Sequence, residues 1–105
     1  MSDTACMVLT TFANAAVGQG IIDGLLAERL AACVQTLPVY SVYRWKGDIC
    51  RDAETLALIK TTEARYPDVE TFIRAHHDYE CPEIVRVPIK GGYGDYLAWI
   101  GEQCR

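Results

Sequence analysis

The stretch that decides the fold is residues 33–62, which read CVQTLPVYSVYRWKGDICRDAETLALIKTT. Its two parts, 33–45 and 48–62, are rich in Val, Thr and Tyr or in alternating apolar residues, and each predicts a long β-strand. Lys46 and Gly47 between them supply a two-residue turn, which favours an antiparallel hairpin. Pro38 has no N–H to donate, so the first strand is expected at a sheet edge or at a bulge.

These two strands are too long for the rest of the chain to cover. A strand of about twelve residues at about 3.3 Å each spans about 40 Å, whereas a domain of this size has a radius of gyration of about 13 Å. The tip of the hairpin, with Tyr43, Trp45 and Ile49, should therefore project beyond the core. A projecting aromatic hairpin favours association, so we expect an oligomer in which the hairpin pairs with or wraps around a neighbouring subunit.

The segments before the hairpin predict a strand and a helix. Residues 5–12, ACMVLTTF, form an apolar run with β-branched members, which is typical of a buried strand. Asn14 is a suitable N-cap for the helix that follows. Apolar residues at helical spacing (Val17, Ile21, Leu25) indicate a face that packs on a sheet, and we expect this helix to end near Ala31.

The segments after the hairpin predict a helix, a strand and a second helix. Pro67 fits the first turn of a helix, whose apolar stripe runs from Val69 to His76. Residues 84–89, IVRVPI, are expected to form the last strand. Asp95 is the expected cap of a closing helix, with Tyr96, Trp99 and Ile100 on its inner face.

The resulting order, β-α-β-β-α-β plus a terminal helix, predicts an α+β fold of the ferredoxin-like sandwich type. No repeat, linker or low-complexity tract interrupts the chain, so residues 1–105 are expected to form a single domain. Both crossover helices would cover one face of the sheet. The other face would stay open unless a neighbouring subunit covers it, which again favours an oligomer.

Composition and charge exclude several classes of protein. Ten Lys and Arg against fourteen Asp and Glu give a net charge of −4, which argues against nucleic-acid partners and anionic membranes. No apolar run reaches the length of a membrane span. Residues 1–4 show no signal peptide. The five cysteines include no C-x-x-C pair, so we expect reduced thiols and a cytoplasmic location.

The adjacent histidines His76 and His77 are the sharpest local feature for metal chemistry. Imidazole is the commonest metal ligand in proteins, but neighbouring residues on an intact helix point about 100° apart. They could converge at a fraying helix end. The alternatives are that His76 packs in the core and that His77 caps the helix C-terminus.

Other candidate groups lie after the histidines and on the hairpin. The run Tyr79-Glu80-Cys81-Pro82-Glu83 offers a phenol and two carboxylates. Trp45 and Lys60 lie on the hairpin strands, and an inward Lys60 could bind an anion or simply protect an edge. No hydrolase, P-loop, dinucleotide or metalloprotease motif is present, so we expect no enzyme; a spatial Cys–His pair is the remaining catalytic alternative.

With these segments in order, the chain resembles the CutA family of divalent-cation tolerance proteins over residues 6–101. The resemblance is carried by LAERLAACV (26–34), VYRWKGDI (42–49), LIKTT (58–62), HDYECPEI (77–84) and YLAWI (96–100). It implies a ferredoxin-like homotrimer whose long hairpins pair around a threefold axis. It also implies a role in tolerance of copper or other divalent metal ions.

The resemblance assigns residues to two kinds of site. The histidine pair linked to copper in some members matches His76 and His77. Those members also have a cysteine where this chain has Thr10, an oxygen group that is a poor ligand for Cu(I). A cleft between subunits is expected to involve Trp45, Lys60, Tyr79 and Glu83.

Two functions follow from the sequence. The first is a cytoplasmic trimeric protein of divalent-cation tolerance that binds copper or a similar metal ion at the histidines. The second is a signalling trimer that holds a small anionic ligand in the clefts between subunits. Neither involves a nucleic acid or a membrane.

Overall fold

A computed structural model describes residues 4–105. Its seven elements run in the order β1 (Ala5–Phe12), α1 (Ala15–Ala27), β2 (Cys33–Trp45), β3 (Asp48–Thr62), α2 (Tyr66–His76), β4 (Val85–Pro88) and α3 (Gly94–Gln103). The expectation about a signal peptide at residues 1–4 falls mainly on residues 1–3, which lie outside the described part. No helix between residues 4 and 105 is long and apolar enough to cross a membrane.

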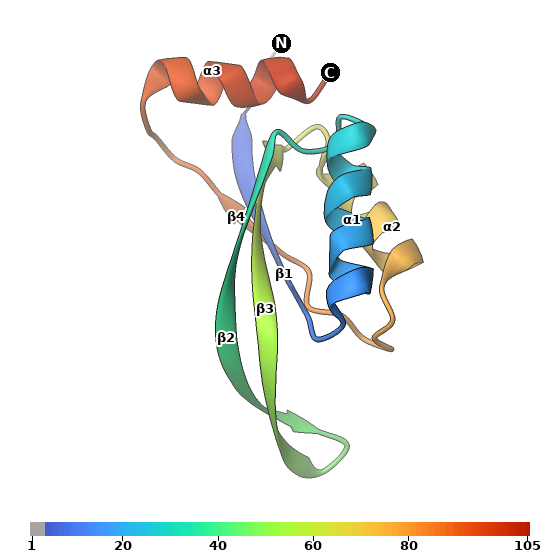
Figure 1. The fold of residues 1–105 in the computed structure, drawn as a ribbon. Helices are drawn as coiled ribbons and strands as arrows, with labels where there is room; N and C mark the ends of the chain where they lie inside the picture. Colours follow the sequence, from blue (N-terminus) through green and yellow to red (C-terminus); the bar gives the residue numbers. More distant parts are fainter. Residues whose placement is uncertain (1–3) are drawn as a thin grey trace.

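The four strands form one antiparallel sheet in the order β2-β3-β1-β4. This order is the one expected for the β-α-β-β-α-β motif. Helices α1 and α2 lie together against one face of the sheet (Figure 1). The main core fills the space between these two layers, with Val8 and Ile59 from the sheet and Ile21, Leu25 and Ile73 from the helices.

The hairpin strands β2 and β3 pair from Cys33↔Lys60 to Trp45↔Asp48. Lys46 and Gly47 form the turn with positive φ angles of 50° and 87°, as a type I′ turn requires. The far end of the hairpin extends beyond helices α1 and α2 (Figure 1). The principal extents are 45 × 25 × 21 Å, so the described chain is about twice as long as it is wide.

Helix α1 begins as expected and ends earlier than expected. The Asn14 side chain accepts hydrogen bonds from the N–H groups of Ala16 and Val17. The expected end near Ala31 is wrong, because Arg29 adopts a left-handed conformation with φ 56°. The N–H groups of Arg29 and Leu30 bond to carbonyls of the last turn. This is a Schellman ending, and it turns Leu30 into the core.

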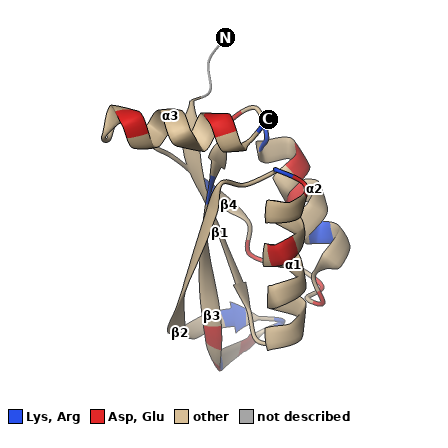
Figure 2. Ribbon diagram, turned by 45° about the horizontal axis from the view of Figure 1, so that its top comes forward, with Lys and Arg blue, Asp and Glu red and all other residues tan. Residues whose placement is uncertain are grey.

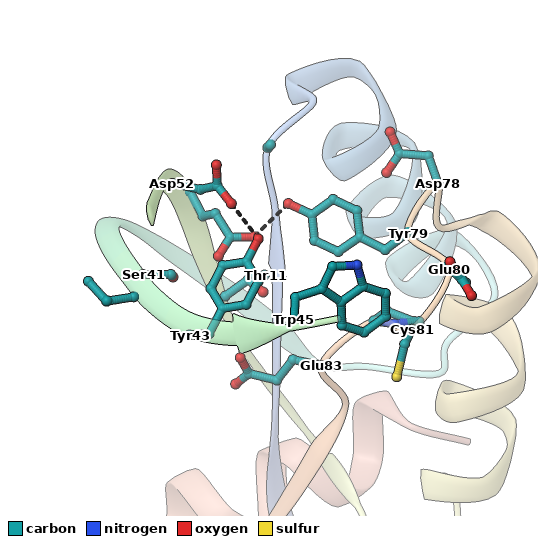
Figure 3. A pocket seen from close by; sticks show the side chains of 14 residues that line it. Thr11, Ser41, Tyr43, Trp45, Asp52, Asp78, Tyr79, Glu80, Cys81 and Glu83 are labelled. Carbon is teal, nitrogen blue, oxygen red and sulfur yellow. Dashed lines mark hydrogen bonds between the residues drawn. The ribbon is translucent and has the colours of Figure 1, made fainter. Parts of the chain in front are cut away.

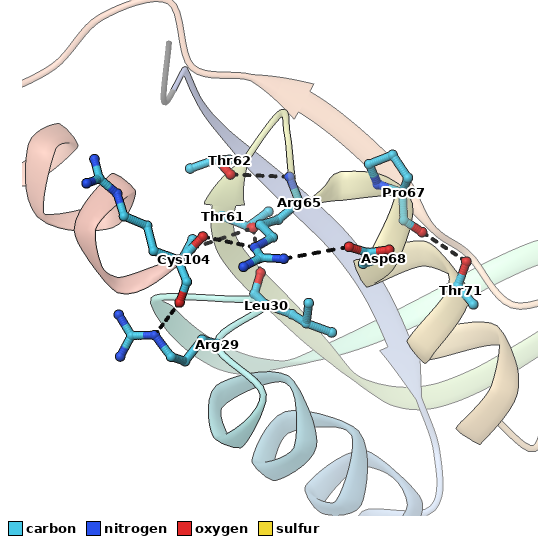
Figure 4. Close-up of polar contacts among 10 residues, drawn as sticks. Arg29, Leu30, Thr61, Thr62, Arg65, Pro67, Asp68, Thr71 and Cys104 are labelled. Carbon is cyan, nitrogen blue, oxygen red and sulfur yellow. Dashed lines mark hydrogen bonds and ion pairs between the residues drawn. The ribbon is translucent and has the colours of Figure 1, made fainter. Parts of the chain in front are cut away.

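Helix α3 crosses the end of the sheet that lies away from the hairpin tip (Figure 1). Two arginines hold its C-terminal end: Arg29 Nε donates to the Arg105 carbonyl (2.6 Å) and Arg65 Nε to the Cys104 carbonyl (2.9 Å) (Figure 4). Asp95 lies in the first turn and accepts from the Tyr93 hydroxyl, so the expectation that Asp95 is the N-cap is wrong. Because Tyr93 rather than Asp95 is the N-cap, the helix starts at Gly94, two residues earlier than expected.

The inner face of α3 is narrower than the sequence pattern indicated. Ile100 is fully buried, while Tyr96 and Trp99 stack on each other and remain 37% and 38% exposed. Acidic and basic positions are scattered over the helices and strands (Figure 2). This distribution agrees with the moderate net charge of −4.

Candidate functional site

A cavity lies between the end of the hairpin and the loop that follows α2. Its volume is about 870 Å³, within the range of small-molecule sites. Figure 3 shows the side chains from these two segments facing each other across it. We call it the hairpin pocket, lined by Thr11, Ala13, Ser41, Val42, Tyr43, Trp45, Asp52, Glu54, Asp78, Tyr79, Glu80, Cys81, Pro82 and Glu83.

Two phenol–carboxylate pairs form one wall of the hairpin pocket. The Tyr43 hydroxyl donates a short hydrogen bond to Asp52, and the Tyr79 hydroxyl donates to Glu54 Oε2 at 2.5 Å. The bond to Asp52 is the main cause that raises the pKa of Tyr43 to about 12. Burial, followed by the bond to Glu54, raises the pKa of Tyr79 well above its usual value. Both tyrosines therefore stay protonated at neutral pH, and each hydroxyl donates its hydrogen bond to a carboxylate.

The charge of the hairpin pocket is negative. Five of its lining residues are carboxylates: Asp52, Glu54, Asp78, Glu80 and Glu83. None of the residues that line it is Lys, Arg or His. Because both phenols already donate to carboxylates, the pocket offers an anion little compensation for desolvation. Its chemistry favours cations.

His77 is a structural residue at the junction of α2 and the loop. Its side chain is completely buried. Nδ1 accepts a hydrogen bond from the Tyr79 N–H (3.1 Å), which places the proton on Nε2, and Nε2 donates to the Thr11 carbonyl (2.8 Å). The ring also packs against the Tyr79 ring, with 4.5 Å between centroids. Both ring nitrogens are thus occupied, and His77 holds the pocket loop against β1.

His76 has the opposite environment on the same helix. It is exposed, stacks on Phe72 at 4.1 Å, and its Nδ1 lies 2.8 Å from the Phe72 carbonyl oxygen. A carbonyl only accepts, so Nδ1 carries the proton and Nε2 keeps its lone pair. This arrangement, one nitrogen oriented by a carbonyl and the other open, is the one that metal-binding histidines use. The alternative of a core histidine at this position is wrong.

The structure brings together three of the four residues expected to form a cleft. Trp45, Tyr79 and Glu83 all line the hairpin pocket. Lys60 does not: it pairs with Cys33 at the other end of the hairpin. There Lys60 Nζ donates to Gln35 Oε1 (2.7 Å) and lies 5.5 Å from the centre of the Tyr96 ring. Within one chain, Lys60 therefore makes no contribution to this pocket.

The pocket residues missed by the sequence reasoning include Tyr43 as a lining residue, Asp52 and Glu54. The two-residue turn contained the necessary signal. A turn at 46–47 pairs 45 with 48, and alternation then places Tyr43, Asp52 and Glu54 on one face of the hairpin. The hydrogen bond of Glu54 could not be predicted from the hairpin alone, because its partner Tyr79 lies in the loop after α2, 25 positions further along the chain.

The metal-binding candidates are dispersed. Thr10, which stands where some family members have cysteine, is fully buried, and its hydroxyl has no hydrogen-bond partner. No group of three or more His, Cys, Asp or Glu residues within 4–105 is arranged to hold a metal ion. The described part of one chain therefore offers single ligands such as His76 Nε2 rather than a complete coordination shell.

The fold and pocket define a small α+β protein with a four-stranded antiparallel sheet, three helices and an acidic, aromatic pocket beside its hairpin. Residues 6–103 match the family model of the CutA1 divalent ion tolerance protein, and the chain belongs to this family.

Bacterial and plant proteins are among the relatives that the chain resembles. The divalent-cation tolerance protein CutA of Thermus thermophilus is 42% identical over 97 residues, which cover 91% of this chain and 94% of the relative. Protein CutA 1, chloroplastic, of rice is 38% identical over 94% of this chain and 56% of its own length. The crystal structure of CutA from Xylella fastidiosa superposes with a TM-score of 0.93 at 35% identity, covering 99% and 100% of the two chains.

Proposed function

We propose that this chain serves divalent-cation tolerance as a homotrimer that binds copper or a similar metal ion. His76 carries the metal proposal: its Nε2 is exposed and open, while its other nitrogen is held by a backbone carbonyl. Imidazole is a good ligand for Cu(II) and Zn(II). His77 joins as a second ligand only if its bonds to Thr11 and Tyr79 break.

The open face of the sheet supports the proposed trimer. Strand alternation puts Met7, Leu9, Leu37, Leu58 and Val85 on the face away from α1 and α2. Leu37 and Val85 are 42% and 46% exposed in the single chain. An apolar sheet face together with the unpaired outer edge of β2 is what a neighbouring copy would cover.

The second candidate, a trimer that holds an anionic ligand, has weaker support. The hairpin pocket is lined with carboxylates and contains no cationic side chain. Lys60, the expected anion ligand, is engaged with Gln35 and Tyr96. The proposal assigns no catalytic step to the chain. It places the protein in the cytoplasm, on the support of the free thiols of Cys6, Cys33, Cys50 and Cys81.

A copper titration against a competing chelator tests the metal proposal. The His76→Ala variant should lose the tightest Cu(II) site, because it removes the open Nε2. Arg74→Ala, at another exposed position on the same helix, is the control and should keep the site. Unchanged copper affinity in His76→Ala would exclude His76 as the ligand.

Two matched leucines test the trimer. Leu37 on the open sheet face and Leu26 on α1 are 42% and 41% exposed in the single chain. By light scattering, wild type and Leu26→Asp should have a mass of three times 11.7 kDa. Leu37→Asp should lose this species, because it buries a charge in the proposed interface. A trimer that persists with Leu37→Asp would contradict the assignment of this face.

A further inference from the structure

Lys46, in the hairpin turn, contacts an aromatic ring and a carboxylate at the rim of the hairpin pocket. Its Nζ lies 3.3 Å from Glu80 Oε1 and 5.5 Å from the centre of the Trp45 ring. Both charged side chains are well exposed, at 66% and 73%. An aromatic face and a carboxylate together are a favourable environment for an organic cation. The chain itself thus places an ammonium group at the mouth of the pocket.

The lining of the hairpin pocket also combines aromatic rings with carboxylates. The rings of Tyr43, Trp45 and Tyr79 line it, as do the carboxylates of Asp52, Glu54 and Glu83 (Figure 3). Aromatic faces pack against alkyl chains and attract cations. Bare divalent ions prefer a closed set of oxygen ligands, and no cluster of three such ligands occurs within residues 4–105.

Glu83 is the carboxylate most available to a ligand. Asp52 and Glu54 accept hydrogen bonds from the two tyrosines, and Glu80 is paired with Lys46. Glu83 is exposed, lines the pocket, and has no hydrogen bond or ion pair to another residue in the described chain. A ligand ammonium could therefore bind Glu83 without breaking an existing contact.

We propose that the hairpin pocket binds a small organic ammonium compound, with its alkyl part against the aromatic rings and its cationic end at Glu83. The ammonium group of Lys46 occupies the position at Glu80 and Trp45 that a ligand ammonium would otherwise take. The inference concerns a ligand class other than metal ions. It does not depend on His76, so the metal proposal and this one can fail independently.

Three five-carbon compounds of equal length and different charge test the ligand class. Cadaverine carries two ammonium groups, 1,5-pentanediol is neutral, and glutarate carries two carboxylates. Each is titrated at about 0.15 M salt, where charges more than about 8 Å apart are screened. The indole N–H signals of Trp45 and Trp99 in 1H–15N spectra report binding. Trp99 lies on α3, away from the hairpin tip, and is the internal control (Figure 1).

Two pairs of variants locate the site. Glu83→Gln removes the open carboxylate, while Glu102→Gln removes one on α3. Lys46→Met removes the internal competitor, while Lys90→Met removes a positive charge that does not line the pocket. We expect cadaverine to bind Glu83→Gln less tightly and Lys46→Met about two- to fivefold more tightly, the size of an exposed cation–π contact. The two control variants should bind it like wild type.

Saturable movement of the Trp45 signal with cadaverine alone, and the two shifts in affinity, would support the proposal. Binding of the diol or glutarate as tight as that of cadaverine would overturn it. Equal movement of both indole signals, no binding, or unchanged affinity in both Glu83→Gln and Lys46→Met would also overturn it. Thermal melts of each variant establish that it remains folded.

Discussion

Replacing His77 with alanine should destabilise the protein far more than replacing its neighbour His76. His77→Ala removes a fully buried ring and two hydrogen bonds, to the Thr11 carbonyl and from the Tyr79 N–H. Each such bond contributes about 1 kcal/mol, and the groups left behind are buried or half-buried. With the lost packing, the expected loss in free energy of unfolding is about 2–4 kcal/mol.

The matched control is His76→Ala on the same helix. It removes an exposed ring that stacks on Phe72 and bonds to the carbonyl of that residue. The expected loss is about 1 kcal/mol or less. A third variant, His77→Gln, retains one donor and one acceptor, and should fall between the two alanine variants.

The assay is denaturant unfolding with a chelator present, so that no metal contributes to stability. All variants are compared at one protein concentration, because an oligomer couples stability to concentration. Equal losses for the two alanine variants, or a loss below about 1 kcal/mol for His77→Ala, would refute the structural role of His77. If that role is correct, a copper defect in His77→Ala is not evidence that His77 binds the metal.

Two further predictions concern packing and ionisation. A Cβ at Gly18 would lie 2.0 Å from the buried Phe12 ring, while one at Gly20 would meet nothing within 4 Å. In thermal melts, Gly18→Ala should destabilise by about 1 kcal/mol or more, and Gly20→Ala should stabilise by about 0.5–1 kcal/mol; the same sign for both would contradict this. Since the folded state raises the pKa of Tyr79 from 10.0, its contribution to stability is complete below pH 10 and declines as the pH rises further. The melting temperature of Tyr79→Phe should fall less steeply than wild type above pH 10, and parallel curves would exclude this role.

Local pattern was sufficient for three of the four strands, while the last one, expected at 84–89, is shorter and forms β4 (Val85–Pro88). The expected strands 5–12, 33–45 and 48–62 coincide with β1, β2 and β3. Each combines β-branched residues with clear turn residues at its end, so propensity and tertiary structure agree. The helix ends were less predictable: Arg29 takes a left-handed conformation that glycine usually supplies, and its side chain then reaches the end of α3.

The candidate site was predictable only in part. The loop 79–83 and Trp45 were identified as candidate segments, and the structure places them around one cavity. The different roles of His76 and His77 could not be predicted from the sequence, because they are adjacent residues of the same type. They follow from the direction of each ring: one faces solvent, and the other faces the backbone of β1.

The sequence by itself determined the α+β class, the long hairpin, the net negative charge and the family, because these depend on local periodicity, composition and motif order. Tertiary structure alone decided the character of the pocket. It joined Tyr79 to Glu54 through a hydrogen bond and brought the loop after α2 against the end of the hairpin. These outcomes depend on contacts between residues far apart in the chain, which no local pattern specifies.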